Sequence, residues 1–106
     1  MYYGYNLETI EDILKVMAEN VKRRRLEKGW TRKTLYDRSG VAVSTIAKFE
    51  SSGKISLTSY VAIAKALGYS SDMKKLMSVP QFSTMAELDT INSNKNRRRG
   101  HRETCK

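Results

Sequence analysis

Apart from its cations, this sequence holds few side chains that could carry out chemistry. It has one histidine, His101, and one cysteine, Cys105. No second ligand stands at a useful spacing from His101 to hold a metal ion. The carboxylates are scattered, and without a glycine-rich phosphate loop they form no triad, metal site or acid–base pair. We therefore expect a protein that is not an enzyme and that binds no cofactor.

Lysine and arginine, in contrast, are abundant: 20 of them against 11 acidic residues, for a formal charge of +9. The positive charge lies in two blocks. Residues 21–56 carry +7 and residues 91–106 carry +5, whereas residues 1–20 carry −3 and residues 57–90 are neutral. A merely solvated surface mixes its signs more evenly. The distribution therefore indicates a polyanionic partner, and favours nucleic acid over a membrane or an acidic protein.

The overall class of protein follows from length and cysteine content. A chain of 106 residues fits one small domain with a tail. A lone cysteine allows no intrachain disulfide, which is typical of a reducing cytoplasm. No apolar run approaches the roughly 20 residues of a membrane span, and residues 1–6 lack the layout of a signal peptide. We expect a cytoplasmic protein without membrane contact.

The elements that must position the cations are helices. Apolar residues recur at helical spacing from residue 8 to residue 77. The first stripe spans residues 8–28, as one helix or two, with Thr9 or Asn6 as its cap; it contains Ile10, Ile13, Leu14, Met17 and Val21. Four more helices are expected over residues 31–39, 43–51, 57–67 and 71–77, the last with Ser71 as its cap.

The sequence changes character after Pro80, the only proline. We expect a domain over residues 1–80 and a basic tail over residues 81–106. The tail contains Thr84 and Glu87 at the spacing of a capping box, which predicts a turn or two of helix. Residues 93–106 are polar and aperiodic, and disorder is expected there unless a partner orders them. The predicted fold class is all-α, with five helices before the tail.

Residues 31–50 have the order helix, short turn with glycine, helix. Thr31 can cap the first of these helices, and Gly40 stands where the turn needs a positive φ. Four apolar residues would fill the wedge between the two helices: Leu35, Val41, Ile46 and Phe49. Such a pair sets its second helix at an angle that allows it to enter the major groove of DNA. The order of elements therefore predicts sequence-specific DNA binding.

The residues of this segment resemble the Cro/repressor-type (XRE) helix-turn-helix family. The resemblance covers about residues 10–77 and rests on Gly29-Trp30-Thr31, Leu35, Gly40-Val41, Ser44-Thr45-Ile46, Phe49-Glu50 and Ile63-Ala64-Lys65-Ala66-Leu67-Gly68. It implies a five-helix domain, a homodimer and a palindromic operator in double-stranded DNA. The link over residues 49–57 and the short basic tail are similar to the branch that includes HipB-type antitoxins, which implies a HipA-like toxin kinase as a partner.

The resemblance also implies which residues contact DNA. Base-reading positions fall on Val43, Ser44 and Lys48. This set is chemically coherent, because lysine can donate to guanine O6 and N7, serine can donate or accept, and valine can pack on a thymine methyl. Phosphate contacts fall on Thr31, Arg32, Thr45 and Lys54.

Three positions depart from the family pattern. Arg32 replaces a usual glutamine, and a charged donor should grip phosphate at least as well. Tyr36 stands where a small alanine is usual, so we expect the helix pair to pack somewhat differently. Ala42 replaces a usual serine or threonine, which removes a cap and a possible phosphate contact.

Several interpretations stay open at this point. The cations from Lys22 to Lys28 fit a solvated helix end or an approach to phosphate. Trp30 is expected to fill the junction between the first two helices rather than to stack on a base. The basic cluster of the tail fits a DNA-clamping arm, a partner-binding segment or a solubilising segment; it comprises Lys95, Arg97, Arg98, Arg99 and Arg102.

The functional interpretations also differ. The first is a repressor that occupies an operator and is the autoregulating antitoxin of a HipA-type pair. The alternative is a stand-alone repressor of the phage or mobile-element type. An RNA-binding or bridging role on the same scaffold is the third.

Overall fold

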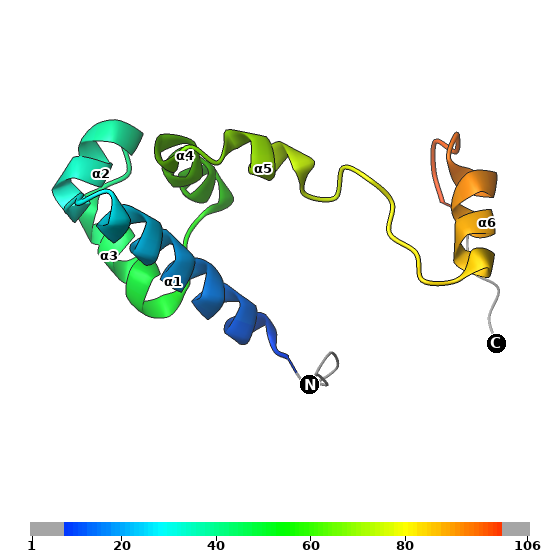
Figure 1. The fold of residues 1–106 in the computed structure, drawn as a ribbon, viewed down its shortest axis with the longest axis horizontal. Coiled ribbons are helices and arrows are strands. Elements are labelled where there is room, and N and C mark those ends of the chain that lie inside the picture. Colours follow the sequence, from blue (N-terminus) through cyan, green and yellow to red (C-terminus); the bar gives the residue numbers. More distant parts are fainter. Residues whose placement is uncertain (1–7, 101–106) are drawn as a thin grey trace. The chain divides into compact units, whose positions relative to one another are not determined.

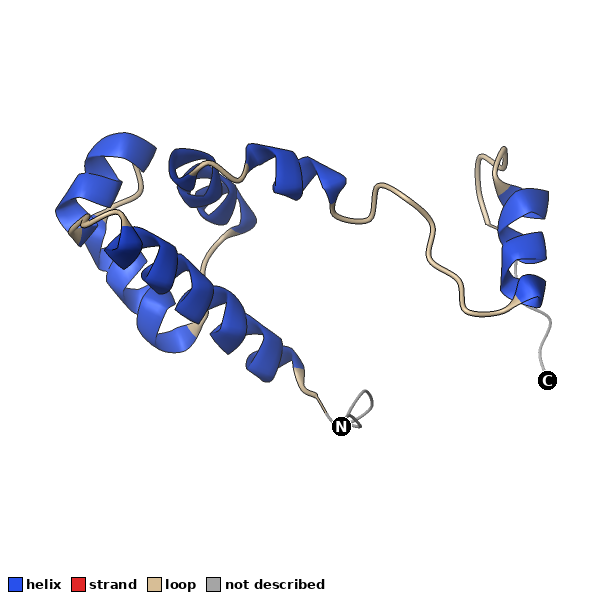
Figure 2. Cartoon of the chain, in the orientation of Figure 1, coloured by secondary structure: helices blue, strands red, loops and turns tan. Residues whose placement is uncertain are grey.

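The computed structural model describes residues 8–100, which form six α-helices and no strands (Figure 2). The helices are α1 (Ile10–Glu27), α2 (Arg32–Ser39), α3 (Val43–Ser52), α4 (Leu57–Leu67), α5 (Ser70–Lys75) and α6 (Met85–Asn94). The chain divides into two compact units, Met1–Lys74 and Lys75–Lys106. The predicted all-α fold is confirmed, while the predicted domain boundary after residue 80 stays a prediction.

The first helix, α1, is a single helix of 18 residues. Thr9 caps it in a capping box: the Thr9 hydroxyl accepts the Asp12 N–H at 3.0 Å, and the Asp12 carboxylate accepts the Thr9 N–H at 3.2 Å. Asn6, the alternative cap, lies outside the described residues. The question of one helix or two is thus settled in favour of one.

The caps of α2 and α3 set the turn between them. The Thr31 hydroxyl accepts the Thr34 N–H at 3.1 Å, so Thr31 caps α2 as predicted. Gly40 ends α2 with φ of 79°, in the left-handed region that side chains other than glycine avoid. Ala42 precedes α3 and makes no side-chain capping bond. The three residues 40–42 therefore form the whole turn between α2 and α3.

The end of α3 is fixed by a close approach to α1. Gly53 has φ of 79°, and a Cβ atom at this position would lie 2.9 Å from the Cβ of Leu14. Only glycine fits both the backbone conformation and this space.

The core lies where α1 and α2 pack against α3 and α4 (Figure 1). Its largest fully buried side chains are Leu35, Ile46, Phe49 and Ile63. The ring of Tyr60 packs edge-on against Phe49, with ring centroids 5.7 Å apart. Two residues of the apolar stripe on α1, Ile10 and Ile13, are 72% and 44% exposed. The apolar stripe of α1 is buried only where α3 and α4 cover it.

Three predictions for the later helices need correction. Ser71 lies within α5 rather than capping it, because the first helical bond runs from the Met73 N–H to the carbonyl of Tyr69. The helix ends at Lys75, two residues early, where the chain leads into Met77 with φ of 60°. The tail also contains a sixth helix, α6, that starts at the predicted Thr84 cap and is longer than the turn or two expected.

Candidate nucleic-acid interface

The turn between α2 and α3 is closed by Ser39. The Ser39 hydroxyl donates to the carbonyl of Leu35 at 2.7 Å and accepts the Val41 N–H at 3.1 Å. All four residues predicted to fill the wedge are buried: Leu35, Val41, Ile46 and Phe49. The Ser39 hydroxyl therefore supplies hydrogen-bond partners for two backbone groups at the turn. The packing of the four buried side chains fixes the angle between α2 and α3.

The third helix has two contrasting faces. Ile46 and Phe49 are buried in the core, whereas Val43 is 40% exposed. Ser44 and Lys48 are exposed as well, and Ala47 between them is half-buried. The three predicted base-reading residues thus share an exposed part of a helix whose opposite side is anchored. Whether they contact bases stays a prediction.

The four predicted phosphate-contacting residues flank this helix. Thr31 and Arg32 lie at the start of α2, Thr45 is half-buried in the first turn of α3, and Lys54 is exposed just beyond its end. The Thr31 hydroxyl is committed to capping α2. Arg32 is 42% exposed and uses its Nε for an intramolecular ion pair, described next. Phosphate contact by these four residues stays a prediction.

Sequence reasoning missed an ion-pair network beneath the third helix. Arg25 donates two parallel hydrogen bonds to the Glu50 carboxylate, from Nε at 2.8 Å and from Nη2 at 2.9 Å. Its Nη1 donates to the carbonyl of Trp30 at 2.9 Å, and Arg32 Nε donates to the same Glu50 carboxylate at 3.1 Å. The Arg25 and Glu50 side chains are only 6% and 2% exposed. The network ties α1, α2 and the end of α3 together.

Two opposing effects act on the pKa of Glu50. Burial of the carboxylate raises it. The hydrogen bonds and positive charges of Arg25, and then of Arg32, act in the other direction and outweigh burial, so the pKa lies below its ordinary value. Glu50 is therefore a carboxylate at neutral pH, held in place by two guanidinium groups.

Arg25 does not fit either interpretation of the Lys22–Lys28 cluster, since it is neither solvated nor available to phosphate. A signal for its burial was present in the sequence: Arg25 follows Val21 by four residues and Ala18 by seven, which places it on the buried stripe of α1.

Trp30 lies at the junction of α1 and α2, as predicted. It is half-buried and packs against the core, with Lys28 Nζ 5.2 Å and Arg38 Cζ 4.6 Å from its ring centroid. Tyr36, the departure from the family pattern, is 42% exposed, with Lys33 Nζ 5.8 Å from its ring centroid.

The basic tail cluster belongs to the second unit. Lys95 follows directly after α6, and Arg97, Arg98 and Arg99 are exposed. Arg102 lies outside the described residues, as do His101 and Cys105.

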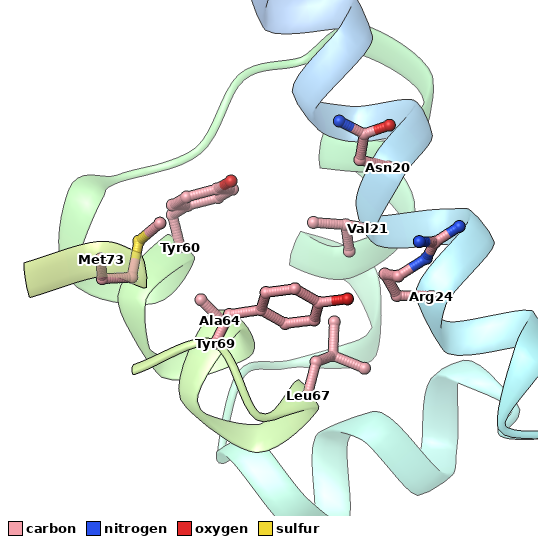
Figure 3. A pocket seen from close by; sticks show the side chains of 8 residues that line it. All are labelled: Asn20, Val21, Arg24, Tyr60, Ala64, Leu67, Tyr69 and Met73. Atoms are coloured by element: carbon pink, nitrogen blue, oxygen red, sulfur yellow. The ribbon is translucent and has the colours of Figure 1, made fainter. Parts of the chain in front are cut away.

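A small apolar pocket of about 150 Å³ opens on the first unit, away from α3 (Figure 3). Figure 3 shows Asn20, Val21 and Arg24 of α1 on one side and the rings of Tyr60 and Tyr69 opposite them. Burial raises the pKa of the Tyr60 hydroxyl. No residue predicted to contact DNA lines this pocket.

Residues 8–100 offer neither a metal site nor a membrane span. That part of the chain contains no group of three or more metal-ligating side chains. None of its helices has the length and apolar character needed to cross a membrane.

Comparison with known proteins gives one match. The helix-turn-helix family model HTH_3 matches residues 21–73, half of the chain. The match covers α2, the turn, α3 and α4, and thus the exposed part of α3 and the network beneath it. No curated protein and no solved structure matched.

Proposed function

The chain belongs to the helix-turn-helix family of DNA-binding transcription regulators, and we propose that α3 reads a specific operator in the major groove. One observation carries the proposal. The exposed part of α3 bears Val43, Ser44 and Lys48, while its opposite side is locked into the core by Ile46, Phe49 and Glu50. A helix held in this way can present side chains to base edges in a fixed register.

Lys48 is the residue we expect to matter most for sequence preference. Its amine would donate to the guanine O6 and N7 acceptors, with Ser44 and Val43 beside it on neighbouring bases. Ala42 supplies no side-chain cap, so the first N–H groups of α3 have no side-chain partner and can meet a phosphate directly.

Phosphate contacts would fix the register of α3 on the duplex. We assign them to Thr31, Arg32, Thr45 and Lys54 around the two helices. Arg32 would combine two tasks, since its Nε donates to Glu50 while the side chain as a whole is 42% exposed. A guanidinium whose direction is already set loses less entropy on meeting a phosphate.

We also propose a homodimer on a palindromic operator, with the dimer interface on α4 and α5. Val61 of α4 and Tyr69, just before α5, are exposed, and residues of both helices line one side of the apolar pocket. A second copy covering it would bury apolar surface that a domain of this size cannot cover alone. Two copies would then read half-sites about 34–36 Å apart.

The interface is tested by introducing a charge. Val61→Glu on α4 should give a monomer with weaker operator binding, measured by analytical ultracentrifugation and fluorescence anisotropy. Val16→Glu, at a similarly exposed valine of α1, is the matched control and should remain a dimer. The reverse result would move the interface to α1.

Repression by operator occupancy is the regulatory mode we propose, as the resemblance to Cro/repressor-type proteins implies. The link over residues 49–57 resembles the HipB-type branch, so we propose a HipA-like toxin kinase as a protein partner. The alternative is a stand-alone repressor of the phage or mobile-element type. Co-purification with a kinase encoded beside the gene supports the antitoxin, and the absence of such a gene supports the alternative.

The decisive experiment is fluorescence anisotropy on DNA from upstream of the gene and on scrambled DNA, over a salt series. A regulator with six to ten phosphate contacts should lose roughly 10³–10⁵ in affinity between about 50 and 200 mM salt, and still prefer its own site. Equal binding to both duplexes would contradict the specific operator. Preference for structured RNA at equal salt would favour the RNA-binding role.

A further inference from the structure

Four cations stand within five residues after α6: Lys95, Arg97, Arg98 and Arg99, which we call the arginine turn (residues 95–99). All four are exposed. Within residues 8–100 every salt bridge lies in the first unit, and none involves the arginine turn. These cations are thus presented to solvent without a carboxylate partner among the described residues.

The arginine turn has a defined scaffold. At the start of α6, the Thr84 hydroxyl accepts the Glu87 N–H at 3.1 Å, and the Glu87 carboxylate accepts the N–H and hydroxyl of Ser83. The hydrogen bonds from Ser83, its backbone N–H first, lower the pKa of Glu87. Glu87 is therefore committed to the start of α6 and is not offered to the arginines.

The other end of α6 bends the arginines into a turn. The Arg97 N–H donates to the carbonyl of Asn94 at 3.0 Å, and Arg97 Nε donates to the carbonyl of Arg99 at 3.2 Å. With Gly100 these residues line a shallow hollow. Compensation of the helix dipole explains one cation near a C-terminus, because the effect fades within the last turn. It does not explain four.

The length of the segment before α6 limits how far the arginine turn can extend from α5. Nine residues, 76–84, connect α5 to α6. Leu76, Met77 and Val79 along it are at least 67% exposed, so packing does not hold them. Fully extended, nine residues span at most about 30 Å. DNA carries a phosphate every ~1.7 Å of its axis, so a segment that extends about 30 Å along a duplex passes many phosphates.

We propose that the arginine turn is a second phosphate-binding element, which contacts the DNA backbone beside the site read by α3. The proposal rests on the proposed operator binding. Because the linker is short, the second contact forms at a high effective concentration once the first has formed. The ligand is the phosphodiester backbone, so the arginine turn raises affinity for any duplex and leaves sequence preference to α3.

The test compares two triple variants of the full chain that lose the same charge. One is Arg97→Gln/Arg98→Gln/Arg99→Gln. The matched control, Lys15→Gln/Lys22→Gln/Lys33→Gln, removes three exposed lysines from α1 and α2, outside the proposed DNA contacts and the proposed dimer interface. Anisotropy is measured on the upstream duplex and on a scrambled duplex across the salt series, and thermal unfolding checks that both variants fold.

The arginine variant should lower the slope of log affinity against log salt by about 2–3, since each lost phosphate contact contributes roughly 0.9. The ratio of affinities for the two duplexes should stay at its wild-type value, and the lysine control should keep the wild-type slope. Equal slopes for the two variants would overturn the proposal. The slope on scrambled DNA is informative even if no operator preference exists, so the two proposals fail separately.

Discussion

The two cationic blocks of this chain have similar composition but different surroundings. In the first unit, Arg25 is buried and Arg32 half-exposed, and both are oriented by Glu50. In the second unit, the arginine turn follows a short helix and has no carboxylate partner among the described residues. In the first unit these arginines stabilise the fold. In the second unit the arginines remain available to a binding partner.

What separates the two cases is one buried carboxylate. A guanidinium with a bidentate partner out of water contributes to folding, and removing that partner is costly. A solvated guanidinium contributes little to folding. Net charge alone therefore overstates how many cations can meet DNA, and each cation has to be judged by its neighbours.

The largest effect is expected from removing the shared carboxylate. Glu50→Gln leaves Arg25 buried without a counter-charge and should lower the free energy of unfolding by about 3 kcal/mol or more. Urea denaturation measures the loss. Glu27→Gln, which breaks the exposed pair with Arg24 at 2.9 Å, is the control and should cost at most about 1 kcal/mol. A similar decrease in the free energy of unfolding for both variants would show that the buried, ion-paired arginine and the exposed one contribute equally to stability.

Acid should weaken the first unit through the same carboxylate. Because the pKa of Glu50 is lowered in the folded state, its contribution to stability is complete above the unfolded carboxyl pKa of about 4.3 and is lost as pH falls through the folded value. Urea denaturation across this range should show a steeper decline for the wild type than for Glu50→Gln. Parallel declines would show that other carboxylates control the acid response.

Lys48 of α3 has no carboxylate partner within residues 8–100, so its role should appear in binding rather than in stability. Lys48→Ala should reduce the preference for the operator over scrambled DNA by about 1–3 kcal/mol, and change the free energy of unfolding by no more than about 0.5 kcal/mol. Lys15→Ala, at an exposed lysine of α1, is the control for both measurements. An unchanged preference would remove Lys48 from the base-reading set.

The smallest effect is expected from Arg32, which pairs with Glu50 like Arg25 but is 42% exposed. Arg32→Gln should lower the salt slope of DNA binding by about 0.9 through one lost phosphate contact, without altering sequence preference. It should destabilise the fold less than Glu50→Gln, since Arg25 still pairs with Glu50. Lys33→Gln, next to it and paired with exposed Asp37 at 3.2 Å, should leave the slope closer to wild type.

The sequence predicted best what short-range chemistry decides. Thr31 and Gly40 mark the ends of α2, and Thr84 marks the start of α6, because caps depend on residues three or four positions away. The wedge residues followed from the spacing of apolar residues. The family match over residues 21–73 agrees with the resemblance found in the same segment.

Features that depend on tertiary packing were not predicted. The pairing of Arg25 with Glu50 joins residues 25 positions apart, and local spacing shows only that Arg25 lies on a buried stripe. Ile10 and Ile13 continue that stripe but are exposed, because periodicity does not tell where the neighbouring helices end. The left-handed Met77 that ends α5 early also carries no sequence signal, since such a conformation is rare outside glycine and asparagine.

The two faces of α3 have a consequence for evolution and engineering. The residues that hold this helix in place, Ile46, Phe49, Glu50 and Gly53, are separate from the exposed Val43, Ser44 and Lys48. Substitutions on an exposed face change stability little. Under the proposed reading of an operator by α3, specificity could therefore diverge among descendants of this protein, or be redesigned by exchanging three side chains, while the scaffold stays the same.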